Sequence, residues 1–392
     1  MGIFQEANEN IQHYVLDVIY ERRSGGFVPL VRALLRALSG LFELAVQIRL
    51  RCYKTGILKT KSLGCMIVSI GNITVGGTGK TPAVEVFARA LQKEGRKVAV
   101  VSRGYRSSSR FTIKRFLKKL FFLLPKEKQV KVVSDGKKIF LNSSLAGDEP
   151  YMLAKKLPGV VVVVDKDRIK AGEYAIQEFG VDTIILDDGY QYLPLNPRFD
   201  VLLVDTTNPF GNSRLLPSGV LREPLVNLNR ADLFLLTKSK PDNDLTELKS
   251  TIRQYNYRAE FIECQHRSIE LVNITDNSVR ELSFLKGKRI ALVSGIADPT
   301  GFEKAIESFG PQVAAVHRFQ DHHRFSEKEI QRILKDGNKK NIAAVVTTEK
   351  DAVRFPQLES TKGIPVFFLR VEMALISGEN VFQDSISRLC FK

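Results

Sequence analysis

One stretch of this chain constrains its fold more than any other: an apolar run that leads directly into a glycine-rich segment. The apolar run covers 65–70, and the next residues, 71–82, read Gly-Asn-Ile-Thr-Val-Gly-Gly-Thr-Gly-Lys-Thr-Pro. A buried strand, a tight turn and a helix that opens with Lys-Thr are the parts of a phosphate-binding loop. Small residues let successive backbone N–H groups point at phosphate oxygens, and the helix N-terminus adds a favourable dipole. The sequence therefore predicts an α/β fold in which this loop binds a nucleoside triphosphate.

The individual positions of the loop have expected roles. Lys80 is expected to reach the β- and γ-phosphates, and the Thr81 hydroxyl to bind Mg²⁺. One position departs from the usual G-x-x-x-x-G-K-[ST] pattern, because Thr74 stands where glycine is expected. The alternative, a glycine-rich turn with a chance Lys-Thr, requires strand, turn and helix to coincide by accident. The predicted nucleotide-binding residues are Thr74, Val75, Gly76, Gly77, Thr78, Gly79, Lys80 and Thr81.

The rest of the chain alternates short runs of Val, Ile and Leu with helix-length stretches, on both sides of a polar turn at 239–244. Continuous apolar runs of this length are typical of buried strands in a parallel sheet. We therefore predict two doubly wound, Rossmann-like parallel-sheet domains, the first of the P-loop type, preceded by an amphipathic helix. The predicted domains are 1–60, 61–238 and 239–392, the last joined by a short β linker. The expected strands are 97–101, 160–164, 182–186, 200–204 and 232–236, then 270–274 and 280–284 in the linker, then 289–293, 312–316, 343–346 and 365–369.

Positive charge is concentrated in one part of the chain. The net charge is +16, and 103–140 alone contains twelve Lys or Arg against two acidic residues. Such a segment favours an anionic surface, either nucleic acid or acidic lipid. Within it, 111–125 has the pattern of a helix with basic residues on one side and Phe and Leu on the other, which suits lipid better than a phosphate backbone. We expect peripheral contact with an anionic membrane and no nucleic-acid binding, although a solvated loop is the alternative.

A second segment with membrane character lies near the N-terminus. Residues 27–57 are apolar except for a narrow stripe at Arg32, Arg36, Ser39, Gly40, Glu43 and Gln47, whose spacing places it on one helical face. The uncharged run between Arg36 and Glu43 is too short to span a membrane. A helix of this kind either lies in the membrane interface or packs against the body of the protein.

Three polar sites follow strands or open helices. Asp187 and Asp188 end an apolar strand, which is where P-loop proteins place the carboxylates that hold Mg²⁺. The alternative is a chance Asp-Asp turn, which is common after a strand. Asp148 precedes a helical run and is either its cap or a base for a substrate hydroxyl. His322 and His323 are two of five histidines, and either a zinc site or a catalytic imidazole explains them.

These motifs together resemble the tetraacyldisaccharide 4′-kinase family of the lipid A pathway in Gram-negative bacteria. The blocks that carry the resemblance cover about three quarters of the chain and run in order through 71–82, 102–105, 134–136, 147–150, 165–168, 186–191, 210–217, 221–225, 294–296, 321–323 and 347–353. The sequence departs from the family at 110–128, which looks inserted, and at Tyr190, where Leu or Phe is usual.

The resemblance implies a kinase that transfers the γ-phosphate of ATP, with Mg²⁺, to the 4′-hydroxyl of a tetraacylated glucosamine disaccharide 1-phosphate. The product is lipid IVA, made by a peripheral protein at the cytoplasmic face of the inner membrane, and we expect a monomer. By position, the resemblance makes Asp148 the base, pairs His322 with it, makes Lys80 catalytic, and assigns the metal to Thr81, Asp187 and Asp188.

Two other functions stay open on the residues alone. A nucleotide switch or partitioning-type ATPase at a membrane has similar loops, although 237–240 lacks the Asp of the guanine-reading [NT]-K-x-D pattern. A basic nucleic-acid-binding module is the other alternative.

Overall fold

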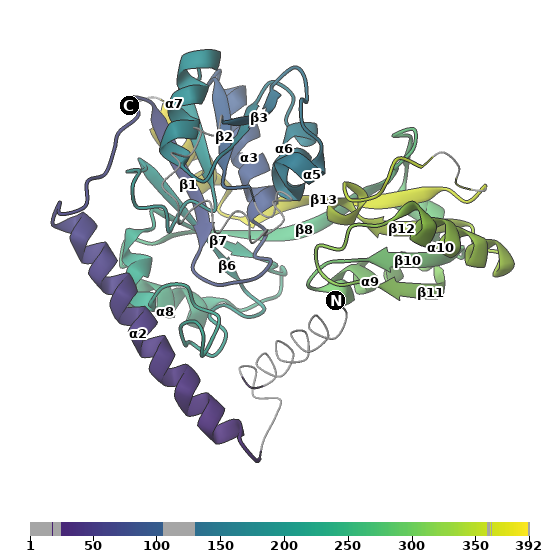
Figure 1. The fold of residues 1–392 in the computed structure, drawn as a ribbon, viewed down its shortest axis with the longest axis horizontal. Coiled ribbons are helices and arrows are strands. Elements are labelled where there is room, and N and C mark those ends of the chain that lie inside the picture. Colours follow the sequence, from purple (N-terminus) through teal and green to yellow (C-terminus); the bar gives the residue numbers. More distant parts are fainter. Residues whose placement is uncertain (1–17, 19–24, 105–129, 359–360, 362, 391–392) are drawn as a thin grey trace, which may run out of the picture. The chain divides into compact units, whose positions relative to one another are not determined.

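The computed structural model describes Val18 and residues 25–104, 130–358, 361 and 363–390. The chain has a mixed α/β fold in which most strand pairs are parallel, which confirms the predicted fold class at that level (Figure 1). The predicted basic segment at 111–125, within the insertion 110–128, lies outside the described residues.

The chain divides into two compact units. The first combines Met1–Lys80, Asp188–Cys264 and Leu375–Leu389, and the second combines Thr81–Asp187, Gln265–Ala374 and Cys390–Lys392. Both units are assembled from separated stretches of chain. The domain boundaries after residues 60 and 238 stay a prediction.

The first unit has a parallel sheet in the order β8–β7–β6–β1. Its strands are β1 (Met66–Asn72), β6 (Phe199–Asp205), β7 (Leu233–Thr237) and the first part of β8 (Glu260–Asn273). Its helices are α2 (Val28–Lys54), the 3₁₀ helix η1 (Leu225–Arg230), α8 (Thr246–Tyr255) and α12 (Glu379–Cys390). Every residue of β1 is buried, as the continuous apolar run predicts. The core joins Leu202 and Phe234 from the sheet to Leu228 of η1 and Ile252 of α8.

Helix α2 attaches to the first unit through the side that carries Ser39 and Phe42, whereas Arg36 and Glu43 of the predicted polar stripe are exposed. The Ser39 hydroxyl donates to the Leu215 carbonyl at 2.9 Å, and Phe42 packs against the core. The opposite side carries leucines that are 57% to 68% exposed: Leu30, Leu34, Leu41 and Leu44. Of the two interpretations of this segment, packing against the body of the protein therefore applies to one side of the helix only. Among the helices that the structure describes, none is long and apolar enough to cross a membrane.

The second unit contains one group of strands in the order β5–β2–β4–β3. These are β2 (Val98–Ser102), β3 (Lys131–Asp135), β4 (Val161–Val164) and β5 (Thr183–Asp187). They pair in parallel except β3, which runs antiparallel to β4 and was not predicted. The accompanying helices are α3 (Lys80–Lys93), α5 (Ser143–Ala146), α6 (Asp148–Lys156) and α7 (Arg168–Phe179).

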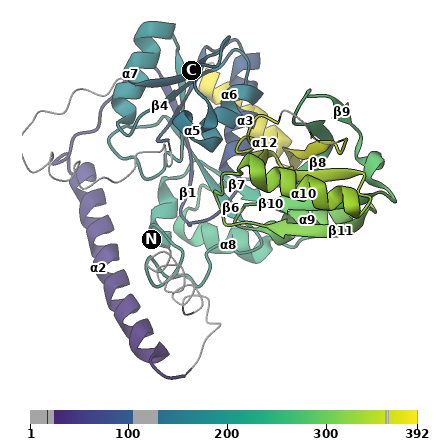
Figure 2. The same cartoon turned by 45° about the vertical axis from the view of Figure 1, so that its right-hand side comes forward.

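The same unit contains a second parallel group in the order β11–β10–β12–β13. Its strands are β10 (Arg289–Ser294), β11 (Gln312–Arg318), β12 (Ala344–Thr348) and β13 (Val366–Ser377), and its helices α9 (Pro299–Glu307), α10 (Glu327–Lys339) and α11 (Glu349–Ala352). Ile290 and Leu292 of β10 share a core with α9, whereas Ala291 and Val293 share one with α10. Because neighbouring residues of a strand face opposite ways, these helices cover opposite faces, and Figure 2 shows α10 lying along the strands.

One of the predicted extended stretches is extended over only part of its length. The first linker stretch, 270–274, falls at the end of β8, but 280–284 is extended only in β9 (Val279–Arg280). The next residues form the 3₁₀ helix η2 (Leu282–Leu285), because that turn directs Leu285 and the flanking apolar side chains into the core beside α9.

Candidate functional site

The predicted phosphate-binding loop lies between β1 and α3. β1 ends at Asn72, and α3 begins at Lys80. Within the loop, Gly76 and Gly79 have φ values of 120° and 87°, a backbone region that side chains with a Cβ rarely adopt. The turn therefore requires glycine at these two positions, as the sequence pattern predicts.

The Thr74 departure from the usual pattern has a local explanation. Thr74 forms an antiparallel bridge with Leu221, and the Val75 N–H donates to the Val220 carbonyl at 2.8 Å. Any residue can adopt extended, paired backbone, so position 74 needs no glycine. Because the Val75 N–H is bonded within the protein, the candidate phosphate donors begin at Gly76. Among them, the Thr78 N–H donates to the Gly76 carbonyl at 3.2 Å and would have to leave it to reach a phosphate.

Lys80 is held by a buried amide at the end of β1. Its Nζ donates to Asn72 Oδ1 at 3.3 Å and lies 3.7 Å from Asp188 Oδ1. The same Asn72 side chain donates to the Thr78 hydroxyl at 2.9 Å, and the Gln191 amide donates to the Asn72 carbonyl. Asn72 thus links the lysine to the far side of the loop. The sequence signal for it was a polar residue at the end of an otherwise apolar strand.

The two predicted metal carboxylates follow β5 and have different surroundings. Asp187 is buried, and its Oδ2 accepts a hydrogen bond from the Ser102 hydroxyl at 3.0 Å. Asp188 has a φ of 53°, and both of its carboxylate oxygens accept from Arg222 Nη1, at 2.8 and 2.9 Å. Arg222 comes from the segment that pairs with the loop, so the loop and Asp188 share one support.

The three predicted metal ligands all offer oxygen: Thr81, in the first turn of α3, has a hydroxyl, and Asp187 and Asp188 have carboxylates. Oxygen ligands of this kind suit Mg²⁺, which binds few protein groups and keeps several waters. Among the described residues, no group of three or more His, Cys, Asp or Glu side chains could hold a metal by itself.

The second unit brings Asp148 together with three basic side chains. Asp148 begins α6, and its Oδ2 lies 2.8 Å from Arg354 Nε and 3.3 Å from His322 Nδ1. Its Oδ1 lies 3.1 Å from Arg324 Nη2. Burial raises the pKa of this carboxyl, but the nearby His322 ring, the charge and hydrogen bond of Arg354 and the charge of Arg324 outweigh it. The pKa of Asp148 therefore lies below its usual value.

The two neighbouring histidines have separate roles. His322 has a φ of 66°, and its N–H donates to the Gly295 carbonyl, which turns its ring toward Asp148. His323 instead stacks on Phe319, with ring centroids 4.6 Å apart, and its Nε2 lies 3.2 Å from Glu329 Oε1. The predicted imidazole of the site is thus His322, while His323 belongs to an aromatic cluster.

The sequence analysis missed both arginines of this site, Arg324 and the more deeply buried Arg354. The Arg354 side chain is fully buried and touches Asp148, His322, Asp351 and the Gly295 carbonyl. It stands one residue beyond the block 347–353. An arginine after a short helix gives no sequence signal of burial.

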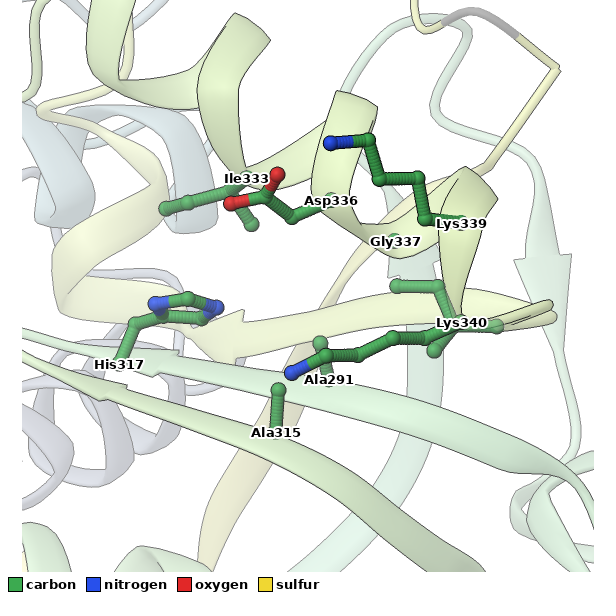
Figure 3. A pocket seen from close by; sticks show the side chains of 9 residues that line it. Ala291, Ala315, His317, Ile333, Asp336, Gly337, Lys339 and Lys340 are labelled. Carbon is green, nitrogen blue, oxygen red and sulfur yellow. The ribbon is translucent and has the colours of Figure 1, made fainter.

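A separate pocket of about 120 Å³ opens between α10 and the strands β10 and β11 (Figure 3). Burial and the nearby charge of Lys340 lower the pKa of His317, which points into this pocket, although Asp336 opposes them. The pocket shares no lining residue with the loop or with the Asp148 cluster. Its lining is Ala291, Ala315, His317, Ile333, Asp336, Gly337, Lys339, Lys340 and Ile342.

Comparison with known proteins gives one consistent result. Residues 31–390 match the model of a family described as Tetraacyldisaccharide-1-P 4′-kinase. A tetraacyldisaccharide 4′-kinase of Anaeromyxobacter dehalogenans (strain 2CP-1 / ATCC BAA-258) is 36% identical over 95% of this chain and 94% of its own length. A protein of the same name from Halothermothrix orenii is 34% identical over 94% of this chain and 95% of its own length.

A solved structure is also similar. The crystal structure of LpxK from Aquifex aeolicus in complex with ATP superimposes with a TM-score of 0.70 at 29% identity. The match covers 92% of this chain and 100% of that one.

Proposed function

The chain belongs to the tetraacyldisaccharide-1-phosphate 4′-kinase family, and from this premise we infer that it is a lipid A 4′-kinase. It transfers the γ-phosphate of ATP to the 4′-hydroxyl of a tetraacylated disaccharide 1-phosphate, forming lipid IVA. The observation that carries this conclusion is the family match over residues 31–390, which spans both the loop and the Asp148 cluster.

We propose that ATP binds with its phosphates at the loop. The N–H groups from Gly76 to Thr81 surround the phosphate oxygens, and Lys80 exchanges Asn72 and Asp188 for the β- and γ-phosphates. Thr81, Asp187 and Asp188 would hold Mg²⁺, which neutralises charge on the β- and γ-phosphate oxygens when bound. Phosphoryl transfer depends mainly on such positioning and electrostatics.

We propose that Asp148 accepts the proton of the 4′-hydroxyl. Its lowered pKa keeps the carboxylate ionised at neutral pH, so it is ready to accept but is a weak base. A weak base suffices in a loose transition state, where the hydroxyl loses its proton late. Before the hydroxyl can approach Oδ1, the Arg324 guanidinium has to move away from that oxygen.

We propose that α2 holds the protein at the cytoplasmic face of the inner membrane. Support comes from the exposed leucine side of this helix, which an interfacial helix would bury among lipid acyl chains. The monomeric state and the absence of nucleic-acid binding stay predictions.

A transfer assay tests the proposed function. Purified protein is incubated with γ-³²P-labelled ATP and the tetraacylated disaccharide 1-phosphate, and the lipids are separated by thin-layer chromatography. We expect a labelled lipid whose mass exceeds that of the substrate by one phosphoryl group. Turnover of ATP at an unchanged rate with and without the lipid, with no labelled lipid, would instead identify a nucleotide switch or partitioning-type ATPase.

A further inference from the structure

A single buried guanidinium organises the surroundings of Asp148. Arg354 Nε donates to Asp148 Oδ2 at 2.8 Å, and Nη1 donates to Asp351 Oδ1 at 3.0 Å and to the Gly295 carbonyl at 2.8 Å. Its third nitrogen, Nη2, lies 3.1 Å from His322 Nδ1. Arg354 and Asp351 are both fully buried. The planar fork therefore has a partner at each of its nitrogens and little freedom to rotate.

The contact between Arg354 and His322 limits where the imidazole proton can be. A guanidinium nitrogen always carries protons, so Nη2 attracts Nδ1 only if Nδ1 offers a lone pair. The same Nδ1 lies 3.3 Å from Asp148 Oδ2, which can attract it only if Nδ1 carries a proton. One nitrogen cannot do both. The shorter distance is the one to Arg354.

The hydrogen bonds that hold Arg354 in place also favour Arg354, rather than Asp148, as the partner of His322 Nδ1. Asp351, which pairs with Nη1, accepts from the Gly295 N–H at 3.0 Å and from the Thr348 hydroxyl at 2.7 Å. The Gly295 carbonyl accepts from both Arg354 Nη1 and the His322 N–H. Arg354 and His322 are thus fixed to the same short turn after β10, and neither can move away from the other without breaking these bonds.

We propose that Arg354 is the positioning residue of the phosphate-acceptor site: it fixes neutral His322 as the tautomer protonated on Nε2, and it orients Asp148 itself. In this arrangement His322 Nδ1 accepts from Arg354, and the donor to Asp148 Oδ2 is Arg354 Nε. The tautomer follows from the geometry alone, whereas its consequence for phosphoryl transfer rests on the proposed function.

The arrangement also distinguishes the two oxygens of Asp148. Oδ2 is held by the fully buried Arg354, whereas Oδ1 is held by Arg324, whose side chain is 43% exposed. The oxygen that can exchange its partner is therefore Oδ1. When the 4′-hydroxyl replaces Arg324 there, its O–H bond breaks, the proton binds Oδ1, and the electron pair stays on the sugar oxygen. That oxygen bonds to the γ-phosphorus of ATP while the bond from this phosphorus to the bridging oxygen breaks, and the electron pair of the broken bond leaves with ADP.

The tautomer can be measured directly by NMR. Protein with ¹⁵N-labelled histidine has five imidazoles, and the spectrum of a His322→Gln variant identifies the signals of His322 by their loss. At a pH where the ring is neutral, we expect the Nδ1 signal of His322 to be that of an unprotonated nitrogen and the Nε2 signal that of a protonated one. A protonated Nδ1 in the neutral ring would overturn the proposal.

A variant tests the role of Arg354 in the reaction. Arg354→Lys keeps the positive charge but lacks the fork, so it cannot hold Asp148, His322 and Asp351 together. We expect kcat to fall by about 100-fold through misplacement of the base, with the KM for ATP within about twofold of wild type. The His322 signals should also move toward a mixture of tautomers.

The matched control is Arg318→Lys, an arginine that pairs with Glu303 away from the site. We expect wild-type kcat and an unchanged His322 spectrum for it. An Arg354→Lys enzyme with wild-type kcat and an unchanged His322 tautomer would contradict the proposal. If that variant does not fold, the wild-type spectrum still decides the tautomer, and a wild-type protein without kinase activity would refute the proposed function separately.

Discussion

At the scale of single residues, Lys80 has protein partners that it has to leave when phosphate arrives. Asn72 Oδ1 and Asp188 hold its ammonium group near the loop, which limits the side-chain entropy lost on binding ATP. A lysine that is already directed into the loop is poised to stabilise the charge that develops on the transferred group.

We expect Lys80→Ala to lower kcat about 1,000-fold, because the transition state loses a charged hydrogen-bond donor. Steady-state kinetics with the lipid substrate measure this change. Lys238→Ala is the control, since Lys238 also follows a strand of the first unit but pairs with Asp205. Equal losses in both variants would mean that the effect is not specific to the loop.

Asp148 is expected to matter less than Lys80. Asp148→Asn should lower kcat about 100-fold, since a general base typically contributes at least this much and proton transfer here comes late. The asparagine keeps the shape of the side chain, so thermal melting should confirm a folded protein. A purified Asp148→Asn enzyme with wild-type kcat would refute the base assignment.

The sequence predicts some residues of the site and misses others for a physical reason. Lys80 belongs to a local pattern of strand, turn and helix, so its place follows from neighbouring residues. Asp148 and Arg354 are 206 positions apart, and no local pattern reports such a contact. The pairing of Asp148 with His322 was expected only through the family resemblance, and the structure places the two side chains 3.3 Å apart.

At the scale of elements, the parallel strands were predictable because they are continuous apolar runs. The burial of β1, β4 and β7 at every position matches that pattern. Two longer strands, β8 and β13, mix buried with partly exposed positions and were recognised only in part. The unpredicted β3 has partly exposed positions at both ends. A continuous apolar run indicates a strand that is buried on both faces, so a partly exposed strand is not recognised by this pattern.

The pairing of the loop with 220–222 leads to a prediction about Thr74. Thr74→Gly would restore the usual phosphate-loop pattern, but glycine loses more conformational entropy in extended, paired backbone, about 0.5–1 kcal/mol. We therefore expect weaker, not tighter, ATP binding, by about two- to fivefold, as isothermal titration calorimetry would show. Tighter binding by the glycine variant would mean that the bridge to Leu221 does not support the loop.

Helix α2 gives a prediction about membrane attachment. The double variant Leu34→Glu, Leu41→Glu places two carboxylates on the exposed apolar side, and each lost leucine removes about 1.5–3 kcal/mol of burial in lipid. Co-sedimentation with vesicles of anionic phospholipid should fall about 100-fold or more.

The control for this experiment is Glu43→Gln, at an exposed position of the predicted polar stripe, which should bind vesicles as wild type does. Circular dichroism checks that the helix persists in all variants. Unchanged vesicle binding by the double leucine variant would show that this side of α2 does not face lipid.

At the scale of the whole molecule, the sequence predicts the kinds of element better than their assembly into units. The first unit contains β1 and its neighbours in sequence, and it also contains 375–389 from the far end of the chain. Local periodicity tells a strand from a helix but not which distant strand it will pair with. The domain boundaries therefore depended on a change of composition near residue 239, and they stay a prediction.

Stability is expected to depend on pH through Asp200. Burial raises the pKa of its carboxyl to about 7, with Asp232 and Glu223 adding to the effect and Arg230 opposing it. Between the unfolded pKa of about 3.9 and this raised value, the folded state binds the proton more tightly. The contribution of Asp200 to the free energy of unfolding therefore falls as pH rises, by up to about 1.4 kcal/mol per pH unit.

Urea unfolding at pH 5, 6 and 8 measures this slope. Asp200→Asn should lose that part of the pH dependence and should be more stable than wild type at pH 8, because no charge then needs to be buried. Parallel pH profiles for the two proteins would show that Asp200 does not titrate in this range.

The central claim is that the loop between β1 and α3 binds the triphosphate whose outer group is transferred. Its most direct test is a crystal structure with Mg²⁺ and adenylyl imidodiphosphate, an analogue that resists transfer. We predict the triphosphate against the N–H groups from Gly76 to Thr81, with Lys80 Nζ moved from Asn72 onto the β- and γ-phosphates. An analogue bound elsewhere, with Lys80 still on Asn72 and Asp188, would contradict the claim.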